Sequence, residues 1–478
     1  MAPCHYLTKC PKPQRSMPLM YKKSLFIFRR DVRIEDNTGL IKALSLSEKV
    51  LPCFIINPQQ VGPHNSYRSM HAIQFMVESL KNLHHALEKK GGHLFLFYGI
   101  PEEIVEKIIS AEKIDAVFVN EDYTPYSRGR DAHLQKLCKN LGIDFISTFD
   151  ALLIKPEDGV SNQGTPYKIF TPFYKKNSSN PIALPVTTKK NNYVTTISGS
   201  HKNVAFLDTL FERSAHLNSS GGRSEGLIVL SHISDFKEYP VTHDIVALPT
   251  TNLSAHIKFG TLSIREVAHA IIENIGTSNR LLRQLYWRDF FYHIAWFYPH
   301  VFGSAFHEKY NQLDWNTSEK DFARWCEGTT GFPLVDAGMR QLNETGFMHN
   351  RARLVVGSFL TKDLHINWLW AEKYFAQKLL DYDPSINNGN WQWIASTGSD
   401  AQPYFRVFNP WLQQKKFDPE CIYIKRWVPE LKNLDVRTIH AWFAQTKSRH
   451  GYPSPCVNHA QEALRAKIRY KRASRLQN

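Results

Sequence analysis

Five short apolar runs recur between residues 24 and 150, and helical patterns or turns separate them. We expect these runs to be strands, at residues 25–28, 50–56, 94–98, 116–119 and 145–147. Helices are predicted between them, at residues 73–87, 101–111 and 128–141. Short, continuous apolar runs are typical of parallel strands that are buried on both faces. The pattern predicts a doubly wound, parallel-sheet α/β domain at residues 22–150.

The turn after the first predicted strand reads Arg29-Arg30-Asp31-Val32-Arg33. It lacks the G-x-G-x-x-G spacing that brings a dinucleotide pyrophosphate against a helix start. The sequence therefore disfavours a dehydrogenase of the Rossmann type.

The rest of the chain changes character twice. Residues 151–225 lack sustained periodicity, which predicts a long interdomain linker that crosses the surface. Residues 226–478 are predicted to form an all-helical domain. Apolar side chains are spaced i, i+3, i+4 at residues 263–275, 281–297, 317–326, 333–342, 350–364 and 370–379. The basic C-terminal sequence, residues 461–478, is either a frayed helix or an extra contact for a polyanion.

Charge and cysteine usage narrow the possible functions. A net charge of +15 favours a polyanionic partner, with solubility alone as the other explanation. The seven cysteines show no CxxC pair and no paired histidine spacing, so we expect no metal, no disulfide framework and a reducing compartment. No apolar run suits a membrane span, and the N-terminal sequence lacks the core of a secretory signal. The cytoplasm of a bacterium or archaeon fits these features.

One polar and aromatic stretch, residues 381–410, stands out in the helical half. Asp381 and Asp383 precede an Asn387-Asn388-Gly389-Asn390 sequence, which we expect to form a turn because Asn and Gly favour turns. Few apolar residues are present to drive a core. Two interpretations remain at this point, an ordinary loop between helices or a segment that wraps a ligand.

Several motifs together resemble those of the photolyase/cryptochrome flavoproteins, and most of all a class I cyclobutane pyrimidine dimer photolyase. The motifs are FIFRRDVRIEDN (26–37), YKIFTPFYK (167–175), TTNLSAHIKFGTLSIREV (250–267), LYWRDFFYHI (285–294), TGFPLVDAGMRQL (330–342), GFMHNRARL (346–354) and the stretch at 381–410. The resemblance covers nearly the whole chain. It implies an α/β antenna domain, a long linker and an all-helical domain that buries FAD in a U-shaped form, usually in a monomer.

The resemblance also implies the cofactor contacts. They are Tyr239, Thr250, Thr251, Leu253, Ser254, Arg288, Asp381, Asp383 and Asn387. Residues 250–254 precede a predicted helix, where free N–H groups suit a pyrophosphate, although an ordinary N-cap cluster explains them too. Asn252 stands where many relatives carry Arg. Asn387 matches the residue beside flavin N5, and a neutral Asn there favours a repair enzyme over a light sensor.

Three tryptophans, Trp391, Trp368 and Trp315, match the electron relay of the family. An indole ring supports a radical cation and therefore passes single electrons. The implied role is photoreduction of oxidised FAD, separate from the repair step. Core packing is the alternative explanation for each ring.

The implied lesion pocket is where the chain departs from the family pattern. Its residues are Trp287, Asn350, Arg351, Leu354, Trp393, Arg406 and Gln413, with Gln284 as a catalytic residue. Trp287 and Trp393 match the pair that stacks on a flipped-out dimer. The (6-4) enzymes carry a proton-donating His at the positions of Asn350 and Leu354, so that acid is missing. Gln284 replaces a usual Glu, and Leu354 a usual Met; Gln donates and accepts hydrogen bonds but supplies no proton or charge. For the arginines, a solvated salt bridge is the alternative.

The resulting prediction is a light-driven lyase that splits cyclobutane pyrimidine dimers in UV-damaged DNA, with reduced anionic FAD as the electron donor. The alternatives are a cryptochrome-type photoreceptor without repair activity and a (6-4) photolyase. A second antenna chromophore is expected in the α/β domain. The residues near Arg30 and Glu121 do not choose between methenyltetrahydrofolate, a deazaflavin and a second flavin.

Overall fold

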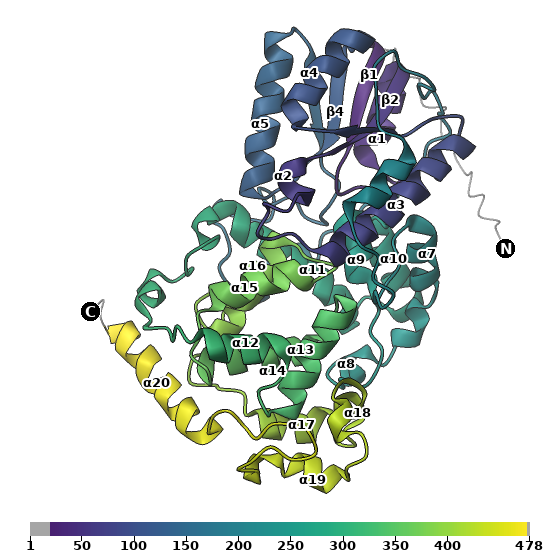
Figure 1. The fold of residues 1–478 in the computed structure, drawn as a ribbon. Coiled ribbons are helices and arrows are strands. Elements are labelled where there is room, and N and C mark those ends of the chain that lie inside the picture. The colour runs from purple at the N-terminus through teal and green to yellow at the C-terminus, as the bar shows by residue number, and fades with distance from the viewer. Residues whose placement is uncertain (1–19, 476–478) are drawn as a thin grey trace, which may run out of the picture.

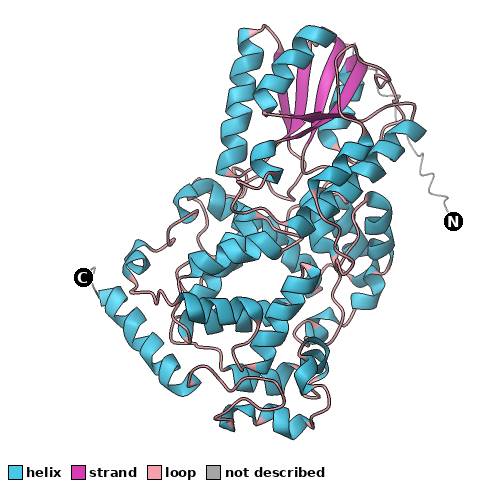
Figure 2. Cartoon of the chain, in the orientation of Figure 1, coloured by secondary structure: helices cyan, strands magenta, loops and turns pink. Residues whose placement is uncertain are grey.

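The computed structural model describes residues 20–475, in which an α/β part (20–150) adjoins a helical part (223–475) (Figure 1). Figure 2 shows all the strands gathered in one sheet at one end of the molecule. The N-terminal sequence that was searched for a secretory signal lies almost entirely outside the described residues. Among the helices of residues 20–475, none combines the length and apolar character needed to cross a membrane.

The five predicted strands are confirmed. They are β1 (Tyr21–Phe28), β2 (Ser47–Ile56), β3 (Phe95–Tyr98), β4 (Ala116–Asn120) and β5 (Asp144–Thr148). All neighbouring strands are parallel, and their order is β3-β2-β1-β4-β5. This order reverses direction at β1, as expected of a doubly wound sheet.

Helices cover both faces of the sheet. They are α1 (Thr38–Leu46), α2 (Pro58–Val61), α3 (Met70–Lys89), α4 (Pro101–Glu112) and α5 (Pro125–Asn140). Phe26 and Phe28 of β1 pack with α1 and α3, whereas Leu25 and Ile27 pack with α4 and α5. The alternation follows from the two-residue period of a strand. Helices α1 and α2 were not predicted from the sequence.

The segment between the two parts is less superficial than predicted. It contains α6 (Phe170–Asn177) and the 3₁₀ helix η1 (Val204–Leu210). Tyr193 forms an isolated parallel β-bridge with Val50 of β2, and its side chain is buried in the core between the sheet and helices α1 and α3. Phe170 is buried against the helical part. The predicted surface course is therefore wrong at these positions, because aromatic side chains anchor the segment to both cores.

The six predicted helices of the C-terminal half are confirmed, with others between them. The α-helices are α7 (Arg223–Ser231), α8 (Tyr239–Thr242), α9 (Leu253–Phe259), α10 (Ile264–Ile275), α11 (Arg280–Phe297), α12 (Glu319–Glu327), α13 (Pro333–Thr345), α14 (Asn350–Lys362), α15 (Trp368–Lys378), α16 (Pro384–Ala395), α17 (Pro410–Phe417), α18 (Ile422–Trp427), α19 (Val436–His440) and α20 (His459–Arg475). The 3₁₀ helices are η2 (Ile233–Phe236), η3 (Pro299–Val301), η4 (Glu308–Gln312), η5 (Pro429–Leu431) and η6 (Trp442–Ala444).

The predicted turn at Asn387-Asn388-Gly389-Asn390 is wrong, since these residues lie inside α16. Tertiary contacts outweigh the poor helix propensity of Asn and Gly. The Asp383 side chain caps the helix start by accepting from two backbone N–H groups, and Asn388 donates to the Val301 oxygen at 2.9 Å. At Gly389 a Cβ atom would lie 2.1 Å from the Phe291 ring, so glycine allows α11 and α16 to approach closely.

The basic C-terminal sequence forms the docked helix α20 as far as residue 475. Ala466, Tyr470 and Ala473 are buried, and the Tyr470 hydroxyl donates to the Ala395 oxygen at 2.5 Å. These contacts exclude a frayed helix in the described residues.

Candidate functional site

A cavity of about 520 Å³ lies in the helical part, between α8–α11 and α14–α16. Its wall brings together most of the residues chosen from the sequence. They are Tyr239, Thr250, Thr251, Leu253, Ser254, Gln284, Trp287, Arg288, Asn350, Leu354, Asp381, Asp383, Asn387, Trp391 and Trp393. The residues chosen as cofactor contacts and those chosen as lesion contacts therefore share one cavity.

The start of α9 faces the cavity with its first N–H groups uncapped. Its N-cap, Asn252, is in the left-handed conformation, and no side chain of residues 20–475 caps this helix. The Asn252 side chain is engaged by Asn218, which donates to it at 3.1 Å. A helix start without a cap leaves N–H donors for an anion. The backbone here suits a phosphate group.

Asp381 and Asp383 play different parts in the site. Asp383 is buried and accepts from Arg30, from the Tyr292 hydroxyl and from the first turn of α16. Burial alone would raise the pKa of Asp383, but the Arg30 charge, the Tyr292 hydrogen bond and the Arg288 charge together outweigh burial and lower it. Asp381 pairs with Arg353 at 3.5 Å. Its Oδ1 is buried without a partner in the described residues, so Asp381 keeps an acceptor for a ligand in the cavity.

Asn387 enters the cavity from α16 and is held by Glu372 of α15. Its amide nitrogen donates to the Glu372 backbone oxygen at 3.0 Å and to the Glu372 carboxylate at 3.1 Å. Burial raises the pKa of Glu372 to about 7. Because the NH₂ group is engaged, the amide oxygen of Asn387 is the atom left for a ligand.

The three tryptophans that were predicted to form an electron relay share one hydrophobic core. Trp391 lines the cavity and is 4% exposed, Trp368 is 3% exposed, and the half-buried Trp315 packs against the same core. Trp391 and Trp368 are thus both buried, and only Trp315 is partly exposed. Trp325, which the sequence analysis did not select, lies 6.2 Å from Trp391 between ring centroids and is fully buried.

The aromatic pair chosen for a lesion comes from two helices that meet at the cavity. Trp287 extends from α11 and Trp393 from α16, and both are half-buried. The Trp287 ring stacks on the Phe170 ring of α6 at 3.7 Å between centroids, so the segment between the two parts fixes the orientation of Trp287. Gln284 is exposed at the cavity, with one long hydrogen bond of 3.5 Å to the Arg280 oxygen.

The structure places five chosen residues outside the described cavity wall. Trp368 and Trp315 lie in or against the core, as above. Arg351 pairs with Asp244 at 2.5 Å, which is the salt-bridge alternative, and also contacts Gln413 at 3.5 Å. Arg406 is exposed in the loop before α17.

Sequence reasoning missed several groups around the cavity. Lys258 lines it, and burial, together with the nearby Arg30 charge, lowers the pKa of Lys258 to about 7. Arg353, Glu372 and Tyr292 support the residues that were chosen. Arg353 lies within the motif at 346–354, which was the one signal that could have identified it.

These features define a protein with a buried site for a large phosphate-bearing cofactor, next to a doubly wound sheet. Comparison with known families agrees. Residues 24–189 match the DNA photolyase model, and residues 281–472 match the FAD binding domain of DNA photolyase. The chain is 33% identical to the deoxyribodipyrimidine photo-lyase of a Synechococcus strain, over 91% of this chain and 93% of that protein. It therefore belongs to the DNA photolyase family of FAD-binding lyases.

Solved structures give the same result. An archaeal photolyase from Sulfolobus tokodaii, with two FAD molecules, is 44% identical with a TM-score of 0.86, over 94% of this chain and 100% of that chain. A Synechocystis cryptochrome is 28% identical with a TM-score of 0.84, over 95% and 99% of the two chains. A photolyase and a cryptochrome thus share this fold. The fold alone does not distinguish a repair enzyme from a light sensor.

Proposed function

We propose that this protein splits cyclobutane pyrimidine dimers in UV-damaged DNA, in a light-driven reaction that uses FAD bound in its reduced anionic form. The observation that carries the proposal is the shared cavity, because a base held between Trp287 and Trp393 would lie beside a cofactor held by Asp381 and Asn387. Relatives named deoxyribodipyrimidine photo-lyase, at 31–35% identity, support it.

The cofactor residues fit FAD. The uncapped start of α9 offers N–H donors to the pyrophosphate, and the unpartnered Asp381 oxygen offers an acceptor. The free oxygen of Asn387 suits the N–H that a reduced flavin carries at N5. When bound, the reduced flavin supplies the photoexcited electron. The residues around it orient both partners and exclude water.

The lesion residues supply binding rather than acid catalysis. Stacking on Trp287 and Trp393 is worth about 1–3 kcal/mol per base. A dimer pairs and stacks poorly in the duplex, so flipping it out costs less than flipping a normal base. Gln284 would bond the thymine carbonyls through its amide. Arg406, and Arg351 with Gln413, are proposed to contact the DNA backbone or lesion edge, which provides affinity without sequence preference.

Trp391, Trp368 and Trp315 are proposed to return oxidised FAD to the reduced form in light. Trp391 at the cavity wall would donate an electron to the flavin, and Trp368 and then Trp315 would refill the electron hole in turn. Trp315 would finally be reduced by a donor in the solvent. The position of Trp391 on the cavity wall and the partial exposure of Trp315 support the assignment.

A cryptochrome-type photoreceptor is the second proposal from this site, since Gln284 and Leu354 depart from the repair pattern. One experiment separates it from repair. The reduced protein is incubated with oligonucleotides that carry either a cyclobutane or a (6-4) lesion, illuminated, and intact thymines are quantified by chromatography. Light-dependent recovery from the cyclobutane lesion alone is expected. If no thymine is recovered from the cyclobutane lesion, the repair proposal is contradicted. If thymine is recovered from the (6-4) lesion instead, the protein is a (6-4) photolyase.

A second, antenna chromophore is also proposed, together with a monomeric state. Three chromophores are candidates for the antenna: methenyltetrahydrofolate, a deazaflavin and a second flavin. The two FAD molecules in the archaeal relative support the second flavin. Chromatography of the released chromophores, with size-exclusion chromatography of the protein, tests both points. One FAD per chain without another chromophore would contradict the antenna.

A further inference from the structure

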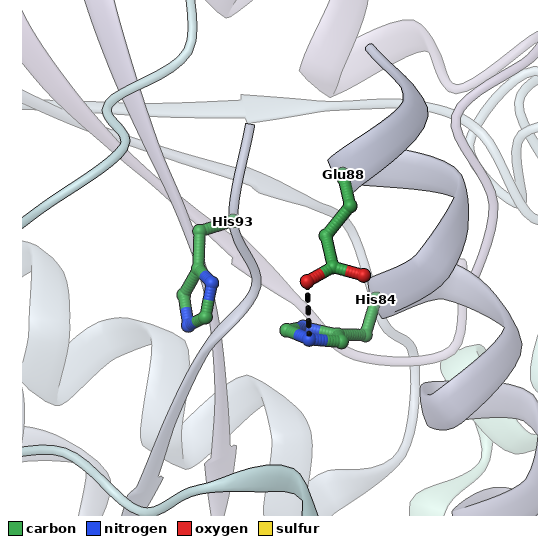
Figure 3. A group of neighbouring side chains, drawn as sticks. All are labelled: His84, Glu88 and His93. Carbon is green, nitrogen blue, oxygen red and sulfur yellow. Dashed lines mark ion pairs between the residues drawn. The ribbon is translucent and has the colours of Figure 1, made fainter. Parts of the chain in front are cut away.

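A separate group of ligand-type side chains lies in the α/β part, formed by His84, Glu88 and His93 (Figure 3). One ligand atom of each residue lies within 4.8 Å of the other two. His84 and Glu88 are one turn apart on α3, with 3.3 Å between Nε2 and Oε1. The rings of His84 and His93 meet edge to face, 4.8 Å apart between centroids.

The turn after α3 brings His93 back to this position. Gly91 has a φ of +73°, a left-handed conformation that glycine adopts without strain. Gly92 lies so close to Tyr193 that an added Cβ would approach its ring to 2.9 Å. The chain therefore reverses within a few residues and enters β3 with His93 against the last turns of α3.

The chemistry of the three side chains suits a metal ion. The Nδ1 atom of His84 is buried and has no partner within residues 20–475. The neutral imidazole is the form that binds metals.

We propose that His84, Glu88 and His93 bind one divalent transition-metal ion, best matched by Zn²⁺. Two imidazoles and a carboxylate are a common zinc set, and bonds of about 2.0–2.1 Å place neighbouring ligand atoms about 3.4 Å apart. The ligand atoms need to approach one another by at most about 1.4 Å, which small rotamer changes provide. The ion would tie the end of α3 to the segment that enters β3. The sequence prediction of no metal rested on cysteines and on paired histidine spacing, and it did not consider this turn.

The full-length protein, stripped with EDTA, is titrated with ZnCl₂ by isothermal titration calorimetry. The variants are His84→Asn with His93→Asn, the single Glu88→Gln, and the matched control His85→Asn. His85 is on the same helix, and its side chain is 65% exposed. We expect the wild type and the control to bind one more equivalent of Zn²⁺ than the double variant. Glu88→Gln should weaken that equivalent at least about tenfold.

The thermal midpoint should rise with Zn²⁺ in the wild type and in His85→Asn, but not in the double variant, because an ion that binds only the folded state stabilises it. Equal Zn²⁺ stoichiometry and affinity in the wild type and in Glu88→Gln or the double variant would overturn the site. Wild-type protein that binds no Zn²⁺ would also overturn it. Either result leaves the repair proposal unaffected, because the cluster lies outside the cavity.

Discussion

The side-chain amide of Asn387 donates to both the backbone oxygen and the carboxylate of Glu372, at 3.0 and 3.1 Å. Glu372 lies on α15 and is 5% exposed, whereas Asn387 faces the cavity from α16. The pair holds the amide oxygen of Asn387 towards the ligand. It also places a carboxyl group in a buried position where burial raises its pKa to about 7.

Glu372→Gln should therefore change how stability depends on pH. In the folded protein Glu372 keeps its proton up to about pH 7, whereas in the unfolded chain it loses it near its ordinary value of 4.5. The folded state binds more protons in that window, so stability falls as pH rises from 4.5 to 7. The total loss is about 3 kcal/mol, and Gln removes it while keeping an acceptor for Asn387.

The measurement is the urea midpoint of the cofactor-free protein between pH 5 and 8. The exposed Glu273→Gln serves as the matched control and should follow the wild type. An equal loss of stability with pH in Glu372→Gln and in the wild type would contradict the raised pKa.

Trp391→Phe should block photoreduction of the oxidised enzyme, since phenylalanine is much harder to oxidise than tryptophan. Chemically reduced Trp391→Phe should still repair the cyclobutane lesion at close to the wild-type rate. Trp325→Phe is the matched control, because Trp325 is also buried and lies 6.2 Å from Trp391. Absorbance of the flavin under illumination follows the reduction. Loss of photoreduction in both variants would assign the effect to packing instead of electron transfer.

The sheet could be predicted from the sequence because its strands are apolar runs bounded by turns. Helix α1 was missed since it runs directly into β2, with Ser47 both the C-cap of the helix and the first residue of the strand. No Gly or Pro separates the two. Local sequence signals identify elements only where such residues mark their ends.

The site was predictable as a set of residues but not as a set of contacts. The motifs named most of the cavity wall, yet the partners of Asp383 and Asn387 come from distant segments. Arg30 lies 353 residues from Asp383 in sequence. Helix α16 itself depends on tertiary contacts, so its Asn and Gly residues looked like a turn. Pairings of this kind depend on the folded packing.

Lys258 should take up a proton when FAD binds. Its pKa of about 7 in the free protein results from burial and from the Arg30 charge. A bound pyrophosphate would raise that pKa, so at pH 8 binding is accompanied by proton uptake and weakens as pH rises further. Calorimetry in buffers of different ionisation enthalpy measures the uptake. Lys258→Arg keeps the charge without titrating, and should bind FAD with little proton uptake; equal uptake in this variant would assign the proton elsewhere.

Gln284→Glu should increase discrimination for the cyclobutane lesion. A carboxylate cannot donate to the thymine carbonyls, but it can accept from a thymine N3–H group. A charged acceptor strengthens such a bond by roughly 1 kcal/mol over the neutral amide oxygen, which corresponds to about a five-fold change. Affinities for damaged and undamaged oligonucleotides, and repair per absorbed photon, measure the effect. The ratio of the two affinities should rise, while FAD content stays the same. Gln60→Glu, at an exposed position on α2, is the matched control and should leave the ratio unchanged. An unchanged ratio in Gln284→Glu would remove Gln284 from the lesion contacts.

Arg30→Met should destabilise the protein by about 3–5 kcal/mol, because it leaves the buried Asp383 carboxylate without its cationic partner. Arg30 lies in the turn after β1 and also donates to the Lys258 oxygen at 3.3 Å, so its loss weakens the joint between the α/β and helical parts. The double variant Arg30→Met with Asp383→Asn should recover part of the loss, since Asn keeps the cap of α16 without a charge. Arg213→Met is the surface control, with a side chain 76% exposed, and should cost at most about 1 kcal/mol. Urea midpoints of the four proteins form the comparison. If Arg30→Met costs no more than Arg213→Met, the ion pair does not hold the two parts together.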